Sequence, residues 1–200
     1  MQKNNRKKAM NKYFYILMLL ALFAIGCKDN SNIVSPVDNA VKTNDIVSNP
    51  NWITLPPSTE NALKKDVAVS KLIHDYEDSE LEINTWYRSR SGKISIYAAA
   101  EFQKYSFNGN RYVTMSVNDE FGTTDFSPSG VWTKPVIFNL RISGIDLHNV
   151  DRSLVDFVYM APDGSYHKAI YKRIYVNTRR GILQVVNAQL PHFSRWGFIN

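Results

Sequence analysis

The amino-acid sequence predicts an all-β protein, in which a single antiparallel β-sandwich follows an N-terminal secretion signal and a disordered tether. Two observations predict the sandwich. Apolar and polar residues alternate with a period of two in several short stretches after residue 66, and turn-forming residues separate these stretches at fairly even intervals. Such alternation places the apolar side chains on one buried face of each strand. Many short strands with regular turns are typical of a sandwich.

Five alternating stretches are the clearest predicted strands. They contain Ile94-Ile96-Ala98, Val113-Met115-Val117, Val136-Phe138-Leu140-Ile142, Val155-Phe157-Tyr159 and Ile182-Gln184-Val186. Predicted turns lie at Ser91-Gly92, Asn108-Gly109-Asn110, Pro128-Ser129-Gly130, Pro162-Asp163-Gly164 and Arg180-Gly181. The turn at Pro162-Asp163-Gly164 is flanked by two apolar stretches and predicts a β-hairpin. Only Tyr97–Lys104, with the sequence YAAAEFQK, is compatible with a turn or two of helix.

The first 26 residues have the parts of a signal peptide. Five Lys and Arg residues and no acid lie in the first 12 positions, an apolar run covers residues 13–25, and Gly26 precedes Cys27. This order is typical of a secretion signal, and the run is shorter than the about 20 apolar residues that a membrane span needs. Ala24-Ile25-Gly26-Cys27 resembles the lipobox of bacterial lipoproteins, where the peptide is cut just before an acylated cysteine. The resemblance implies that Cys27 is lipidated, and several acyl chains would anchor the protein stably to a membrane.

Residues 27–65 are expected to form the lipidated cysteine and a flexible linker, and residues 66–200 the folded domain. The linker is rich in Asn, Ser, Pro, Asp and Thr and shows no helical or alternating period, so its isolated apolar residues cannot assemble a core. Trp52 and Ile53 are candidates for fixing its end to the domain. Lys28-Asp29-Asn30 resembles the tails of surface-exported lipoproteins. We therefore expect a bacterial cell-envelope protein, anchored to the outer membrane and either periplasmic or exposed at the surface.

The net charge of the chain changes when the signal is removed. The full sequence carries 24 Lys and Arg against 18 Asp and Glu, a formal net charge of +6. Cleavage before Cys27 removes five of these cations and no acid, which leaves +1. A nucleic-acid-binding protein is expected to keep a clustered basic excess, so nucleic acid is excluded as a partner. The single cysteine cannot form a disulfide within the chain, so the fold depends on its core alone.

Two blocks of the domain carry a family resemblance. The first runs from Phe126-Ser127-Pro128-Ser129-Gly130-Val131-Trp132 to Lys134-Pro135-Val136, and the second is His192-Phe193-Ser194-Arg195-Trp196-Gly197. Over residues 66–200 the sequence resembles the ZU-five module shared by zonula occludens protein, ankyrins and Unc-five netrin receptors, in a bacterial secreted form. Trp196 stands where Tyr is commoner in the family. The resemblance implies a β-sandwich that binds other proteins or holds neighbouring domains in place.

Motifs for metals, nucleophiles and phosphates are missing from the sequence. It contains no H-E-x-x-H, C-x-x-C, G-x-S-x-G or glycine-rich phosphate loop, so no metal site and no cofactor are expected. Asp75–Glu82 holds five acids but no glycine. A calcium loop commonly needs a glycine for its sharp turn, so a solvated acidic turn is favoured over a calcium site. His74, His148 and His167 occur singly, as surface or hydrogen-bonded histidines usually do.

Aromatic and cationic residues are interleaved in two stretches, Trp86-Tyr87-Arg88-Ser89-Arg90 and Tyr171-Lys172-Arg173-Ile174-Tyr175. Recognition surfaces are enriched in aromatic residues and arginine, and a sugar ring can stack on such side chains. The candidate binding residues are therefore Trp86, Tyr87, Arg88, Tyr171, Arg173 and Tyr175. The alternative, which is favoured, is the exposed half of two strands with long side chains lying along it.

The segment Pro191–Ile199 admits two interpretations. In the first, which is preferred, it is the final strand of the sandwich, with aromatic residues on both faces and Pro191 at its start or at an edge. The second rests on the resemblance to self-cleaving ZU-five modules and to the nucleoporin autoproteolytic domain. There, Ser194 Oγ would attack the carbonyl carbon of Phe193 while His192 moves the proton. This reaction also needs a strained peptide bond, which a sequence does not reveal.

These observations favour a non-catalytic binding or scaffolding domain that a lipid displays at the cell envelope. Its expected partners are the membrane, through the lipid, and an unidentified envelope or extracellular protein or glycan. Self-cleavage between Phe193 and Ser194 is the first alternative. An enzyme that acts on an envelope glycan or peptide is the second, because a pair of catalytic carboxylates leaves no recognisable spacing in a sequence.

Overall fold

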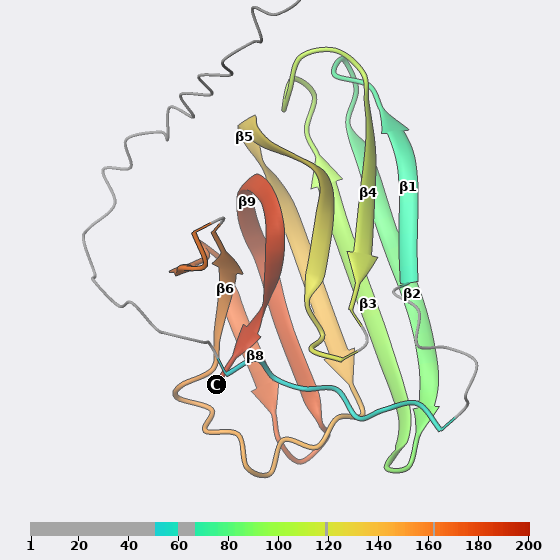
Figure 1. Cartoon of the computed structure of the whole chain (residues 1–200), viewed down its shortest axis with the longest axis vertical. Helices are drawn as coiled ribbons and strands as arrows, with labels where there is room; N and C mark the ends of the chain where they lie inside the picture. The colour runs from blue at the N-terminus through green and yellow to red at the C-terminus, as the bar shows by residue number, and fades with distance from the viewer. Residues whose placement is uncertain (1–50, 60–66, 119, 162) are drawn as a thin grey trace, which may run out of the picture. The chain divides into compact units, whose positions relative to one another are not determined.

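The computed structural model describes residues 51–59, 67–118, 120–161 and 163–200, and within these ranges the chain contains strands but no helix. Nine strands of the described chain form one continuous antiparallel sheet (Figure 1). They are β1 (Val67–Ile73), β2 (Ser79–Ser89), β3 (Gly92–Phe102), β4 (Arg111–Val117), β5 (Thr124–Ser143), β6 (Asp156–Met160), β7 (Tyr166–Lys168), β8 (Arg173–Asn177) and β9 (Ile182–Ile199). The predicted all-β fold is confirmed.

Two long strands, β5 and β9, bend so that each belongs to both halves of the sheet. Residues 136–143 of β5 and 182–190 of β9 lie in layer A, in the order β2-β3-β5-β9-β8. Residues 124–131 of β5 and 192–199 of β9 lie in layer B, in the order β1-β4-β5-β9-β6-β7. Figure 1 shows both strands folding over near the top of the view. The register between them shifts where they bend.

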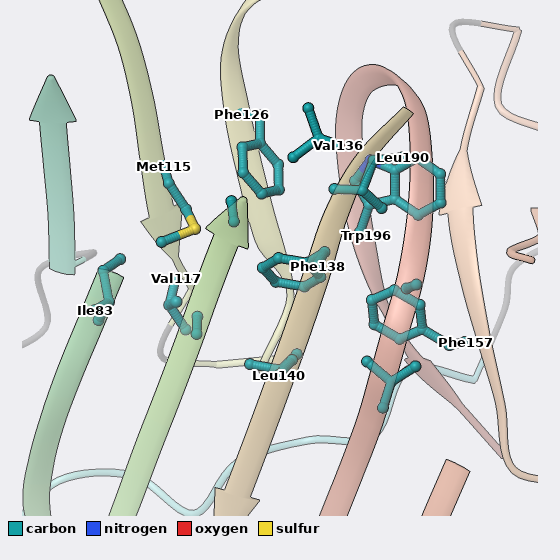
Figure 2. Close-up of a cluster of buried hydrophobic side chains, with 14 of the residues drawn as sticks. Ile83, Met115, Val117, Phe126, Val136, Phe138, Leu140, Phe157, Leu190 and Trp196 are labelled. Atoms are coloured by element: carbon teal, nitrogen blue, oxygen red, sulfur yellow. The ribbon is translucent and has the colours of Figure 1, made fainter. Parts of the chain in front are cut away.

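The hydrophobic core lies between the two layers. Phe126 and Phe138, from the two halves of β5, have ring centroids 5.4 Å apart, and Phe138 stacks on Phe157 of β6 at 6.1 Å. Figure 2 shows these rings directed toward one another, with Met115 and Leu190 beside them. Burial of one large apolar side chain contributes about 1.5–3 kcal/mol, so facing aromatic side chains hold the layers together. Two antiparallel layers with a core between them form the predicted sandwich.

Side chains alternate between the two faces of β9, and the set that points into the core switches between odd-numbered and even-numbered residues three times along the strand. The buried side chains are Leu183 and Val185, then Ala188 and Leu190, then Phe193, and finally Trp196 and Phe198. At the first change Asn187 has a φ of 54°, and its backbone N–H donates to Asn139 Oδ1 at 3.0 Å. An extra residue in one strand re-aims the side chains that follow it, and Asn tolerates a positive φ better than most residues. Pro191–Ile199 is strand, as preferred, but the placement of Pro191 at a start or an edge is wrong. Pro191 lies inside β9 between Leu190 and His192, where the pairing with β5 is interrupted, so its missing N–H breaks no ladder bond.

Two local predictions are wrong. Tyr97–Lys104 is not helical, because residues up to Phe102 belong to β3, where Ala98 and Ala100 lie in the core. Sheet pairing on both sides of β3 overrides the helix preference of an alanine run. The turn expected at Pro128-Ser129-Gly130 lies inside β5, where the register with β9 shifts between Asp125 and Gly130. The chain bulges there instead of reversing.

The other predicted turns separate strands as expected. Residues 161–165 close the β6–β7 hairpin, where the Gly164 N–H donates to the Ala161 carbonyl at 2.9 Å; Pro162 of this turn lies outside the described residues. The turn before β9 depends on Gly181, which has a φ of 59°. A Cβ atom there would lie 2.1 Å from the Ile145 carbonyl oxygen, so only glycine fits.

Residues 51–59, here named the strap, pack against the ends of the strands (Figure 1). Trp52 bridges to Ile199, the Ile53 N–H donates to the Phe198 carbonyl at 3.0 Å, and the Leu55 N–H donates to the Glu120 carbonyl at 2.7 Å. The Ile53 and Leu55 side chains are buried. The expectation that Trp52 and Ile53 fix the end of the linker is confirmed. The packed domain thus includes residues before the boundary expected at residue 66.

The predicted signal peptide (1–26), Cys27 and the linker up to residue 50 lie outside the described residues. In the part of the chain that the structure describes, no helix has the length and apolar character needed to cross a membrane.

Candidate functional site

The outer face of layer A, opposite the core, carries a row of aromatic and polar side chains. Strand register pairs five of them one after another: Asn84 of β2, Tyr97 of β3, Arg141 of β5, Gln184 of β9 and Tyr175 of β8. Residues directly opposite each other point to the same face of a sheet. Their neighbours along the strands, such as Ile96 and Leu140, are buried in the core, so these five point outward. We name them the cross-strand row.

The cross-strand row presents aromatic rings over a wide flat surface. Neighbouring strands lie about 4.8 Å apart, so a row across five strands is roughly 19 Å long. Tyr97 and Tyr175 are 37% and 42% exposed. Trp86 lies two residues beyond Asn84 on the same face of β2 and is 55% exposed. Three large aromatic side chains therefore face solvent on one side of layer A.

The polar members of the cross-strand row have unused hydrogen-bonding capacity. Among the described residues, the side chains of Asn84, Arg141 and Gln184 make no hydrogen bond and no ion pair. Asn and Gln each offer two N–H donors and a carbonyl acceptor, and Arg offers five donors. The Tyr175 hydroxyl accepts a hydrogen bond from Asn177 Nδ2 at 3.0 Å. The row therefore offers donors and acceptors between exposed aromatic rings.

Charge is distributed unevenly over the β2–β3 part of this face. Glu80 and Glu101 are register partners at one end, and Arg88 and Lys93 are partners at the other. Burial raises the pKa of the Tyr97 phenol, and the negative charges of Glu82, Glu80 and Glu101 raise it further. The negative charges at the acidic end of the face therefore act on the Tyr97 side chain.

The structure separates the candidate binding residues into two groups by orientation. Trp86 and Arg88 are exposed on β2, and Arg173 and Tyr175 are exposed on β8. Tyr87 is half-buried, and its hydroxyl donates to the Pro56 carbonyl at 2.8 Å, so it holds the strap. The two stretches lie on opposite edges of layer A, with β3, β5 and β9 between them.

Tyr171 is also held by the fold. Its hydroxyl donates to Asp156 Oδ1 at 2.7 Å, and Asp156 Oδ2 pairs with Lys168 Nζ at 2.5 Å. Burial raises the pKa of the Tyr171 phenol, and the neighbouring Asp156 carboxylate raises it further. Tyr171 therefore connects β6 to the start of β8.

Sequence reasoning missed Asn84, Tyr97, Arg141 and Gln184. Alternation assigns Tyr97 and Arg141 to the solvent face of their strands, so for these two the signal was available. Asn84 lies in no predicted alternating stretch. Gln184 was grouped with Ile182 and Val186, whereas Leu183 and Val185 are the side chains that lie in the core. The alignment of the four missed residues depends on the registers of four strand pairs, which alternation along single strands does not define.

His192, Phe193 and Ser194 lie in the second half of β9 and differ in environment. Phe193 is 4% exposed and packs against Trp132 and Phe126, with ring centroids 4.2 Å and 4.7 Å apart. The His192 ring lies 4.4 Å from that of Tyr159. Ser194 Oγ is buried and has no hydrogen-bond partner. A serine acting as nucleophile is normally hydrogen-bonded to its base, and no such bond joins Ser194 to His192.

The acidic segment is divided between a turn and a strand. Asp75 Oδ2 accepts a hydrogen bond from the Gly109 N–H at 2.8 Å, and Asp78 Oδ1 accepts one from the Lys104 N–H at 2.7 Å. These carboxylates fasten the β1–β2 turn to the β3–β4 loop, while Glu80 and Glu82 belong to β2. Within the described ranges, no three His, Cys, Asp or Glu side chains are grouped to hold a metal ion.

No family model, curated protein or solved structure matches this chain. The resemblance to ZU-five modules therefore rests on the two sequence blocks around residues 126–136 and 192–197, and it stays a hypothesis.

Proposed function

We propose that this chain is a lipid-anchored, non-catalytic binding protein of the bacterial cell envelope, and that layer A holds a polysaccharide on its outer face. The observation that carries the proposal is the cross-strand row, in which polar side chains that have no hydrogen-bond partner among the described residues alternate with or lie beside exposed tyrosines. A sugar ring has hydroxyl groups around its rim and apolar C–H groups on its faces. Amides and a guanidinium suit the hydroxyls, and aromatic rings suit the C–H faces.

A polysaccharide fits this face better than a protein partner does. The centre of a protein interface is usually apolar and depleted in charge. Here the centre of the row is Arg141, with Tyr97 and Gln184 as its neighbours. An extended polymer that lies across the strands meets all five side chains in turn.

The anchor is part of the proposal. Cys27, after a signal peptide and a lipobox-like sequence, would carry the lipid, and the linker would hold the domain away from the membrane. The ZU-five resemblance supports a binding or scaffolding role, but it names no partner for this chain. The protein would be periplasmic or exposed at the surface of the outer membrane.

Co-sedimentation with insoluble polysaccharides, including material from the producing cell's envelope, tests the proposal. We expect the wild type to bind at least one polymer and the Tyr97→Ala/Tyr175→Ala variant to lose that binding. Tyr112→Ala is the matched control, because Tyr112 is a tyrosine that is 70% exposed on β4 of layer B. Equal loss in the control, or no binding to any polysaccharide, would contradict the proposal.

Enzymatic activity is the competing outcome. The polysaccharides and envelope peptides that are tested for binding should also be tested for cleavage. Turnover that disappears with a single carboxylate substitution, for example Glu82→Gln, would replace the binding role with a catalytic one.

A further inference from the structure

A depression of about 500 Å³ lies at the β2–β3 hairpin, at one end of the outer face of layer A. It is lined by Thr59, Trp86, Arg88, Ser89, Arg90, Gly92 and Lys93. Three of these seven residues are cationic, and none is acidic. We name this depression the hairpin pocket.

The cations of the hairpin pocket have no carboxylate partners in the described part of the chain. Arg88, Arg90 and Lys93 take part in none of its ion pairs. Lys93 Nζ lies 4.8 Å from the centre of the Trp86 ring, on its face. Like charges held close together repel one another, so an anion that enters the pocket relieves this repulsion.

The frame of the pocket is hydrogen-bonded. The Thr59 N–H and its hydroxyl both donate to the Arg88 carbonyl, at 2.9 Å and 3.1 Å. Ser89 Oγ lies 2.9 Å from Ser91 Oγ and donates to the Gly92 carbonyl, also at 2.9 Å. The Thr59 bonds join the strap to β2, and the Ser89 bonds hold the hairpin turn. A site on a fixed frame binds with less loss of conformational entropy.

The pocket is continuous with the cross-strand row. Trp86 lines the pocket, and it follows Asn84 on the outward face of β2. A polymer that continues from the row along β2 reaches Trp86 and the cations beside it.

We propose that the hairpin pocket binds the carboxylate of an acidic sugar, so that the ligand of layer A is a carboxylated polysaccharide. This inference rests on the proposed function and adds the class of polysaccharide. An arginine guanidinium matches a carboxylate with two parallel hydrogen bonds, which a neutral hydroxyl does not reproduce. Trp86 supplies a flat surface for the ring that bears the carboxylate.

Affinity measurements on paired polymers test this inference. The probes are polygalacturonate, alginate and hyaluronan, each compared with the neutral polymer obtained by reducing its carboxyl groups. We expect the purified protein to bind at least one acidic polymer about tenfold or more tightly than its reduced form, as expected for charge-assisted hydrogen bonds. The Arg88→Gln/Arg90→Gln variant should lose this preference and keep the weaker affinity for the reduced form.

The matched control is Lys104→Gln/Arg152→Gln, which removes two exposed charges outside the pocket. An equal loss of preference in this control would mean diffuse electrostatic attraction and would overturn the inference. Equal binding of acidic and reduced polymers would overturn it while leaving the proposed function intact. Binding to no polymer, acidic or neutral, would overturn both. Equal binding of a polymer that carries only phosphate groups would replace the carboxylate with a general anion.

Discussion

Single residues at the bend of β9 join the two layers, and Phe193 is the clearest of them. Its ring contacts those of Trp132, Phe126 and Phe102. Phe193→Ala should lower the free energy of unfolding by about 3–5 kcal/mol, because it removes these contacts and leaves a cavity. Val131→Ala, at a position that is 64% exposed, should change it by only about 0.5 kcal/mol. Urea denaturation followed by tryptophan fluorescence measures both, and equal losses would contradict the packing described.

The environment of Ser194 bears on whether β9 stays intact or is cut between Phe193 and Ser194. Its buried Oγ has no hydrogen-bond partner, and Phe193 is a register partner of Gly130 in the β5–β9 ladder. We expect the purified, denatured protein to keep the mass of the uncut chain in the wild type and in Ser194→Ala. Intact-mass spectrometry makes the measurement. Loss of residues 194–200 in the wild type alone would establish self-cleavage.

Tyr171 should make the free energy of unfolding depend on pH in the alkaline range. Its phenol has a raised pKa in the folded state, whereas a tyrosine in the unfolded chain has a pKa of about 10. The neutral phenol therefore stabilises the fold fully below about pH 10, and this stabilisation is lost as the pH rises above that value. Tyr171→Phe should show a flatter decline. Urea midpoints between pH 7 and 11 compare the two proteins, and parallel curves would contradict the assignment.

At the scale of elements, the strap closes the core although it is not a strand of the sheet. Ile53 and Leu55 are 8% and 6% exposed. Substitution of a buried Ile or Leu by Ala costs about 2–5 kcal/mol, so Ile53→Ala/Leu55→Ala should lower the melting temperature clearly. Thr54→Ala, between them and exposed, is the control. Calorimetry compares the variants, and an unchanged melting temperature in the double variant would mean that the strap is dispensable.

Alternation along the chain predicted β3, β4, β5, β6 and β9, and it gave the buried face of the first three. It failed where pairing with distant segments determines the structure. The alanines at 98–100 favour a helix locally, yet β2 and β5 pair with them from both sides. The Pro128 segment has the residues of a turn, yet β9 keeps it within a strand. In the strap, isolated apolar residues have no period, and only Trp52 and Ile53 were identified as contacts with the domain.

The cross-strand row shows the same limit for the site. Trp86, Arg88 and Tyr175 were identified from local composition, whereas Arg141 and Gln184 were not. A shift of one residue in any of the four registers would turn a strand's polar side chains inward. Which side chains share a row is therefore a property of the assembled sheet.

At the scale of the whole molecule, the proposed anchor makes the location of the protein depend on one thiol. Cys27 is the only cysteine of the chain, so its substitution removes any thiol-linked lipid. In the producing cell, a palmitate analogue should label the wild type and leave Cys27→Ala unlabelled. Cell fractionation should then move the variant out of the membrane fraction. Equal labelling of both proteins would contradict the lipoprotein hypothesis.

The pairing of β5 with β9 has a consequence for how the protein is made. Asp125 and Arg195, which form a bidentate ion pair, are 70 residues apart in the chain. Pairings between distant segments form slowly, because the intervening loop must close before any contact repays its entropy. Both layers contain β9, and β9 is the last of the described strands along the chain. Neither layer is therefore complete until β9 has left the ribosome. A chain interrupted before β9 exposes the unpaired strands that drive aggregation.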